Sequence, residues 1–366
     1  MTDAQSHNMQ EQDYKRLLHN TKQQIGRGLT VQNAAIPPFL IQSWQRSHGY
    51  GLSPDDQCLT GKAYFSYPLS ESDRYLASIV GQEIDAIWDS FGGANWVVYC
   101  TNIKSLIIRT KQGTNPASRT FAMHTGRRIQ ECDLGTNAPN CAIQEGIPIF
   151  LSGSEHYLEE FEDLFCCSVP LWGAWGKIIG ALNITGNETF KSKLVEKKLL
   201  TAATKITNQL FLETHHTSQI FRFHYDAGFI DTHMAGLIAT TESGDIVATN
   251  HNGMEMIDPI NPFRKRYRMS DLLRGRIVTS NRYCSKVSLP NGIILYLKSH
   301  EASENNSFIT TPPIAATDAL CDIRDLYILE VIKKAGGNIS KAAHILGISR
   351  TTLYRSLHRS QNKKSP

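Results

Sequence analysis

The last thirty residues of the chain carry hydroxyl and guanidinium side chains at a spacing that suits hydrogen bonding to nucleic-acid bases. On a helix that starts after Ser349, each residue turns by about 100°, so Thr351 and Arg355 share one face while Leu353 and Leu357 lie on the opposite face. Hydroxyl and guanidinium groups are among the side chains that read base edges in the major groove of DNA. We therefore expect contacts with double-stranded DNA from Lys341, Ser349, Arg350, Thr351, Thr352, Arg355 and Arg359.

The distribution of charge also indicates a nucleic-acid partner for this end of the chain. Residues 331–366 include eight basic residues and no acidic one. Subtracting these eight from the 38 basic residues leaves 30 against 34 acidic ones, so the body of the 366-residue chain is slightly negative. A basic end on a neutral-to-acidic body is typical of a DNA-reading part joined to a domain with another task.

Three short helices must position the polar face. The spacing predicts a first helix over Asp322–Lys334, stopped by two glycines, and a second over Ile339–Leu346, capped by Asn338. Gly347 supplies a tight turn before the third helix, Arg350–Arg359. The small pair Ala342–Ala343 allows two helices to cross closely. This arrangement predicts a helix-turn-helix, and the alternative is a basic helical hairpin that packs on a protein partner.

The rest of the sequence predicts an α+β protein. Strand-like runs such as NWVVYC, SLIIRTK and KIIGALNITG follow a helix that ends near Phe91, and a second α+β region closes with GIILYLKSH. We expect an N-terminal helical segment (1–68), an α+β domain (69–190), a connecting helix (191–222), a second α+β module (223–300), a linker (301–318) and an all-α DNA-binding domain (319–366).

The connecting helix has two interpretations. Its apolar residues Val195, Leu199, Ala202, Ile206 and Leu210 recur every three or four positions, which makes one face of the helix apolar. This face either pairs with its copy in a second subunit or packs on its own domain.

Bulk composition excludes several classes of protein. No apolar run reaches the ~18 residues that a membrane span needs, and the polar start of the chain lacks the apolar core of a signal peptide. The eight cysteines include no Cys-x-x-Cys pair, so we expect free thiols, no structural metal and a cytoplasmic location.

Three stretches resemble one family of bacterial regulators. Gly336–Ser360 resembles the Fis-type helix-turn-helix of bacterial enhancer-binding proteins. SWQRS (43–47) and Leu134–Gly186 resemble the sensor half of the acetoin-catabolism and dihydroxyacetone-metabolism branch of that family. The residues that match the sensor pattern are Gly135, Thr136, Asn137, Glu155, His156, Cys166, Pro170, Gly176, Gly180 and Gly186. A weaker match in the second module rests on Gly244, Ile246 and Asn250.

This resemblance implies a GAF-like sensor domain followed by a PAS-like module. It makes Glu155, His156, Cys166 and Asn183 the candidate contacts for a small-molecule effector whose identity the sequence does not give. Cys166 could act as a redox-sensing thiol or, with His156, as a soft-metal ligand. The structural alternative is that the cysteine is a small buried hydrophobe and that Glu155 and His156 serve as caps or hydrogen-bond partners.

The sequence departs from the family in one respect. No G-x-x-x-x-G-K-[ST] phosphate loop occurs, and no central ATPase fits between the sensor and the helix-turn-helix. We therefore expect a regulator that occupies DNA without ATP hydrolysis, as a homodimer that could contact RNA polymerase, with no catalytic residue and no cofactor. The rival interpretations are a GAF-based thiol enzyme with a DNA-binding tail and an adaptor for an ATPase-bearing activator.

Overall fold

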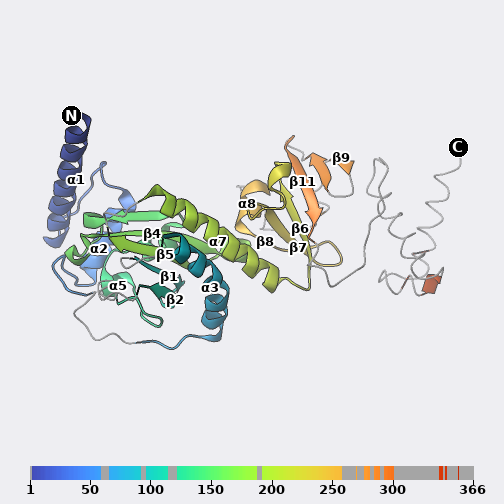
Figure 1. Cartoon of the computed structure of the whole chain (residues 1–366), viewed down its shortest axis with the longest axis horizontal. Helices are drawn as coiled ribbons and strands as arrows, with labels where there is room; N and C mark the ends of the chain where they lie inside the picture. Colours follow the sequence, from blue (N-terminus) through green and yellow to red (C-terminus); the bar gives the residue numbers. More distant parts are fainter. Residues whose placement is uncertain are drawn as a thin grey trace. The chain divides into compact units, whose positions relative to one another are not determined.

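The fold comes from a computed structural model that describes residues 2–58, 66–91, 96–113, 122–187, 192–257, 269, 276–280, 284–288, 292–300, 338–340, 343 and 353. The chain divides into two compact units. The first comprises Met1–Ile220 and Asp231–Arg266, and the second comprises Phe221–Ile230 and Tyr267–Pro366. The first unit contains the sheet and helices that position the candidate effector residues (Figure 1).

A five-stranded antiparallel sheet forms the centre of the first unit. Its strands are β1 (Trp96–Asn102), β2 (Ile107–Gln112), β3 (Ile149–Ser152), β4 (Leu164–Trp172) and β5 (Ile178–Asn187), in the order β2-β1-β5-β4-β3. The strands predicted from the sequence over this region are confirmed. β1, β4 and β5 are buried along almost their whole length because helices cover both faces of the sheet.

Two long helices, α3 (Glu71–Phe91) and α7 (Lys193–Thr214), cover the outer face of the sheet (Figure 1). Ser70 begins α3 by accepting a hydrogen bond from the Asp73 amide, and the Ser192 hydroxyl caps α7 in the same way. The apolar stripe of α7 is 0–1% exposed at Val195, Leu199, Ala202 and Ile206, within one core with α3 and the sheet. These residues of the connecting helix thus pack on their own domain, as the second of the two interpretations predicted.

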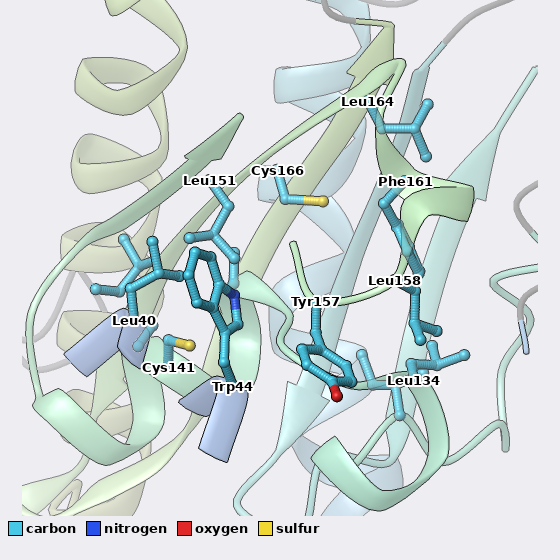
Figure 2. Close-up of a cluster of buried hydrophobic side chains, with 14 of the residues drawn as sticks. Leu40, Trp44, Leu134, Cys141, Leu151, Tyr157, Leu158, Phe161, Leu164 and Cys166 are labelled. Carbon is cyan, nitrogen blue, oxygen red and sulfur yellow. The ribbon is translucent and has the colours of Figure 1, made fainter. Parts of the chain in front are cut away.

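The inner face of the sheet is covered by α1 (Thr2–Gly26), α2 (Pro38–Gly49), α5 (Glu131–Leu134) and α6 (Ala138–Glu145). Leu18 of α1 and Leu40 and Trp44 of α2 are at most 1% exposed and share one core with Val97 of β1. The described part of the N-terminal segment, which the sequence set apart as residues 1–68, therefore contributes to the core of the first unit. Figure 2 shows Leu40 and Trp44 beside Leu151 and Cys141.

Short elements complete the first unit. These are the 3-10 turns η1 (Gly153–Glu155), η2 (Glu159–Phe161) and η3 (Ala174–Gly176), the hairpin of β7 (Gly236–Thr240) and β8 (Ile246–Thr249), and the helix α8 (His251–Ile257). Gly244 has a φ of 81°, in the left-handed region, at the turn of the β7–β8 hairpin. Asn250 follows β8, and its side-chain oxygen accepts from the amides of Leu237 and Gly253 at 2.8 Å each.

The second unit holds β9 (Arg276–Ser280), β10 (Ser285–Ser288), β11 (Ile294–Ser299) and most of β6 (Gln219–His224), together with the 3-10 turn η5 (Ala227–Phe229). β6, β11, β10 and β9 form successive antiparallel pairs. The strand predicted from GIILYLKSH is confirmed as β11.

Candidate functional site

Two described residues report on the DNA-reading segment. Ala343 and Leu353 are helical and only 3% and 0% exposed. Both were assigned to the core side of the helix-turn-helix, Ala343 at a close helix crossing and Leu353 opposite the polar face. The residues expected to contact DNA lie outside the described residues, so their roles stay predictions: Lys341, Ser349, Arg350, Thr351, Thr352, Arg355 and Arg359.

Glu155 joins the N-terminal helices to the edge of the five-stranded sheet. One carboxylate oxygen accepts from the backbone amide of Ser152 at 2.8 Å and thereby caps η1. The other accepts from the Tyr14 hydroxyl of α1 at 3.2 Å, and the Glu155 carbonyl accepts from the Trp44 indole at 2.9 Å. These bonds fit the capping alternative for Glu155, and they connect two sequence motifs, SWQRS and the Glu155–His156 pair.

His156 is fully buried beside Glu155. Its Nδ1 lies 3.0 Å from the Gly153 carbonyl, and its ring stacks on Phe161 at 5.1 Å. Within the described residues, its Nε2 is buried without a hydrogen-bond partner. Burial lowers the pKa of His156 to about 4, so the imidazole is neutral at physiological pH.

A buried lysine of α1 sits against the same turn. Lys22 is 3% exposed, donates from Nζ to the His156 carbonyl at 2.9 Å, and lies 5.6 Å from the ring centre of Trp44. Burial lowers the pKa of Lys22 to about 8, although Glu162 and Glu159 act in the opposite direction. The polar composition of α1 gave no sign that this lysine would be enclosed.

Cys166 and Cys167 point to opposite faces of β4, as expected for neighbours on a strand. Cys166 belongs to the inner core and Cys167 to the outer core. The Cys166 sulfur lies 3.1 Å from the Thr185 hydroxyl, and burial raises the pKa of the Cys167 thiol. Both thiols are at most 3% exposed. Such burial favours the hydrophobic interpretation of these cysteines over a reactive thiolate.

Asn183 lies on the inner face of β5, at the centre of the sheet, and is fully buried. The side-chain amide can be oriented so that both its nitrogen and its oxygen form hydrogen bonds. In that orientation the nitrogen donates to the Cys167 carbonyl at 3.0 Å, and the oxygen accepts from the Tyr99 hydroxyl at 3.1 Å. The structure thus brings Asn183 together with Cys166 on one face, through the shared neighbour Thr185. Glu155 and His156 lie at the end of β3 instead.

A buried polar network explains the SWQRS motif, whose acidic partner could not be inferred from the sequence. Glu131 is 4% exposed and accepts two hydrogen bonds from Arg46, at 2.6 and 2.8 Å. Ser43 donates to the same carboxylate at 2.6 Å and lies 2.8 Å from the Thr136 hydroxyl. Glu131 was missed because nothing in its local sequence distinguishes it from a surface acid.

The first unit also contains a contact between the five-stranded sheet and α8. The ring of Trp172, at the end of β4, stacks on His251 with centroids 4.3 Å apart and an interplanar angle of 4°. The side-chain oxygen of Asn208 in α7 accepts from the side-chain nitrogen of Asn250 at 2.8 Å. The side-chain nitrogen of Asn208 donates to the His233 carbonyl at 2.8 Å. The β4–β5 connection and α7 therefore both contact the region around β8 and α8.

Neither a metal-binding cluster nor a membrane-spanning helix occurs in the described part of the chain. No group of three or more His, Cys, Asp or Glu residues there could hold a metal ion. No described helix is long and apolar enough to cross a membrane.

Residues 326–359 match the family described as bacterial regulatory protein, Fis family. The chain is 23% identical over 225 residues to a signal-transduction and transcriptional-control protein of Clostridium beijerinckii, which covers 60% of this chain and 35% of that protein. It is 24% identical over 230 residues to the acetoin catabolism regulatory protein of Cupriavidus necator, which covers 60% of this chain and 34% of that one. The chain thus spans about a third of the length of these relatives.

Among solved structures, the complex of E. coli DhaR(N) with DhaL gives a match with a TM-score of 0.45 and 11% identity. It covers 73% of this chain and 100% of that chain. Taken together, the Fis-family match and the regulator relatives show a helix-turn-helix of the kind that binds DNA in transcription regulators.

Proposed function

We propose that this protein is a sequence-specific transcription regulator that acts by occupying DNA and does not hydrolyse ATP. The observation that carries the proposal is the Fis-family match over residues 326–359. This segment overlaps the predicted three-helix reader, Asp322–Arg359, and contains six of the eight basic residues that follow Val331. Neutralising phosphates with these basic residues supplies affinity, while the polar helix face supplies sequence preference.

The buried core of the reader supports the same proposal. A recognition helix needs one apolar side to hold it on the other helices and one polar side to enter the groove. Leu353 is completely buried, and Thr351 and Arg355 lie on the other side of a helix in that register. One helix-turn-helix covers a half-site, so we propose that a homodimer binds paired half-sites and that DNA-bound protein contacts RNA polymerase.

The thiol-enzyme alternative has little support in the described residues. A nucleophilic cysteine needs exposure and a lowered pKa. Cys166 is 3% exposed and Cys167 is 1% exposed, and burial raises the pKa of Cys167. We propose instead that the first unit is a non-catalytic sensor that binds a small effector and controls the reader.

The proposal is tested by selecting binding sites for the purified full-length protein from a random pool of duplex DNA. We expect a recurrent motif with two similar half-sites about one or two helical turns apart. Adding salt should weaken binding steeply, because phosphate contacts release counterions. Recovery of sequences with no shared motif would contradict the proposal of a sequence-specific regulator.

A further inference from the structure

The positive charge of the chain is concentrated in a second stretch besides its end. Residues 262–300 contain nine basic residues and one acidic residue, Asp271. Setting these aside from the 30 basic and 34 acidic residues of positions 1–330 leaves 21 basic against 33 acidic. The chain therefore has two separate basic stretches, 262–300 and 331–366, and an anionic partner is expected for each of them.

The strand register of the second unit gathers cationic side chains on one face of the sheet. Lys298 of β11 pairs with Arg222 of β6. Tyr296 of β11 pairs with Lys286 of β10. Directly opposed residues of an antiparallel pair share a face, and so do residues two apart on one strand. One face of β6, β11 and β10 therefore carries three cations, Arg222, Lys286 and Lys298, and is called the basic face below.

Side-chain contacts agree with this register. Lys286 Nζ lies 5.8 Å from the ring centre of Tyr296. Arg222 Nε donates to Nδ1 of His300, which follows β11, at 2.9 Å. Burial lowers the pKa of His300, and the positive charges of Arg222 and Lys298 lower it further. Arg222 and Lys298 thus lie close together although their like charges repel, an arrangement that a bound anion would stabilise.

The basic face is the open side of these strands. The opposite face carries Phe223, Val287 and Leu295, which are 1–4% exposed and form the core side. The three cations of the basic face are each partly exposed. The turn η5 covers one end of the basic face, where the Phe229 ring lies 5.2 Å from the ring of the buried His224. The remainder of the face is accessible to a partner.

The dimensions of the basic face suit a phosphate backbone. Neighbouring strands lie ~4.8 Å apart, and residues two apart on a strand lie ~7 Å apart. The Cα positions of Lys286 and Arg222, at opposite corners of the face, are therefore separated by about 12 Å. One strand of duplex DNA carries a phosphate every ~3.4 Å along the helix axis. The face consequently spans about three or four successive phosphates.

The position of the basic face in the chain identifies the DNA that it would meet. Residues 300–325 separate the end of β11 from the segment that matches the Fis family. Such a connection keeps DNA that is held by the helix-turn-helix at a high effective concentration near the basic face.

We propose that the basic face of β6, β11 and β10 binds the phosphate backbone of duplex DNA beside the site held by the helix-turn-helix. The proposal rests on the proposed function, because the reader brings the DNA, and it deepens that function by assigning DNA contacts to a second part of the chain. Each cation that contacts a phosphate releases ~0.9 counterion. The face thus adds affinity and salt dependence without sequence preference.

The test measures the affinity of the full-length protein for duplex DNA at several salt concentrations. The duplexes are the selected site with long flanks and a random sequence of equal length. Lys286→Gln combined with Lys298→Gln should lower the slope of log Kd against log salt by about 1.8 on both duplexes. At 0.1 M salt the same double variant should bind both duplexes at least about tenfold more weakly.

Two further double variants separate charge at this face from other effects. Lys286→Arg with Lys298→Arg keeps both charges and should retain the wild-type slope. Lys193→Gln with Lys197→Gln removes two charges from exposed positions of α7 in the first unit and should also retain it. An unchanged slope in the first double variant would overturn the proposal. An equal fall in either of the other two, or a loss confined to single-stranded DNA, would overturn it as well.

The random duplex keeps this test independent of the proposed function. Phosphate contacts carry no sequence information, so the change in slope is measurable even if no recurrent motif is selected. Absence of a motif would contradict the sequence-specific regulator, whereas an unchanged slope would contradict only the DNA contact of the basic face.

Discussion

At the scale of single residues, the first unit depends on buried polar groups that connect distant parts of the sequence. Arg46, Ser43 and Thr136 surround one enclosed carboxylate, Glu131. The family pattern in the sequence contained Ser43, Arg46 and Thr136, but the partner that makes sense of them lies 85 residues from Arg46 and outside any motif. An ion pair between residues so far apart leaves no pattern in the nearby sequence. The motif could therefore be recognised from the sequence, but its role in binding Glu131 could not.

Removing Arg46 should destabilise the first unit strongly. Arg46→Ala leaves the carboxylate of Glu131 buried without its bidentate partner, and breaking a buried pair typically costs about 3–5 kcal/mol. Because Arg46 is itself about a third exposed, we expect a loss of roughly 2–4 kcal/mol in the free energy of unfolding, measured by urea denaturation. Lys111→Ala is the control, since its partner Asp85 is half exposed, and it should change stability by less than about 1 kcal/mol. Similar small losses in both variants would show that the Arg46 pair is not structurally important.

His156 should make stability depend on mildly acidic pH. The unfolded imidazole titrates near pH 6.5, whereas the folded one titrates near pH 4. Between these values the unfolded chain binds a proton that the native protein excludes, so stability is complete above pH 6.5 and falls as pH decreases toward 4. From pH 7 to pH 5 this residue should account for a loss of about 2 kcal/mol.

The contribution is isolated by comparing urea denaturation at the two pH values in wild type, His156→Gln and His19→Gln. His156→Gln should flatten the pH dependence, whatever its effect on stability at pH 7. His19→Gln changes a half-exposed histidine and is the matched control for replacing a histidine by glutamine. An unchanged slope in His156→Gln would show that His156 is not the group that titrates.

At the scale of elements, periodicity predicted most of the first unit. Alternating and continuous apolar runs gave β1–β5, and the three-four spacing gave α3 and α7. The sequence did not decide whether the apolar face of α7 packs on its own domain or on a second subunit, because both arrangements require the same spacing of apolar residues. α1 was expected only as polar, helix-friendly sequence. Its burial at Leu18, Lys22 and Ile25 depends on a surface made by distant residues.

The Trp172–His251 stack should couple the five-stranded sheet to α8 energetically. Face-to-face ring contacts contribute about 0.5–1.5 kcal/mol beyond burial, so Trp172→Ala and His251→Ala should be non-additive by a similar amount in a double-mutant cycle of unfolding free energies. Trp172→Ala combined with His216→Ala, which changes an exposed residue elsewhere, should be additive. Additivity in the first pair would show that this contact does not couple the five-stranded sheet to α8.

At the scale of the whole molecule, the first unit and the reader depend on contacts of different range. Residues far apart in the sequence share the cores of the first unit, whereas the reader matches the Fis family over residues 326–359 and buries Ala343 and Leu353. The sequence predicted the segment because its caps, turn and apolar side lie within thirty consecutive residues. It could not predict the effector residues in this way, since the strands that carry them come together only in the fold.

The absence of a phosphate loop from the 366 residues predicts that transcriptional effects need no ATP hydrolysis by this protein. The purified chain should show no ATP turnover above that of a blank preparation, with or without its selected DNA site. Repression or activation in a reconstituted transcription assay should depend on occupancy of that site alone. ATP turnover that co-purifies with the protein through successive columns would contradict this prediction.

The most direct test of the central claim compares Arg355→Ala with Lys363→Ala on the selected DNA site and on random duplex of equal length. Arg355 is predicted to face the major groove, so its removal should cost ~1–3 kcal/mol on the specific site and relax the preference at one base position. Lys363, in the basic end, should contribute only to phosphate contacts, and its loss should weaken binding to both duplexes equally. Equal losses on specific and random DNA for Arg355→Ala would contradict the account of a sequence-reading helix in this protein.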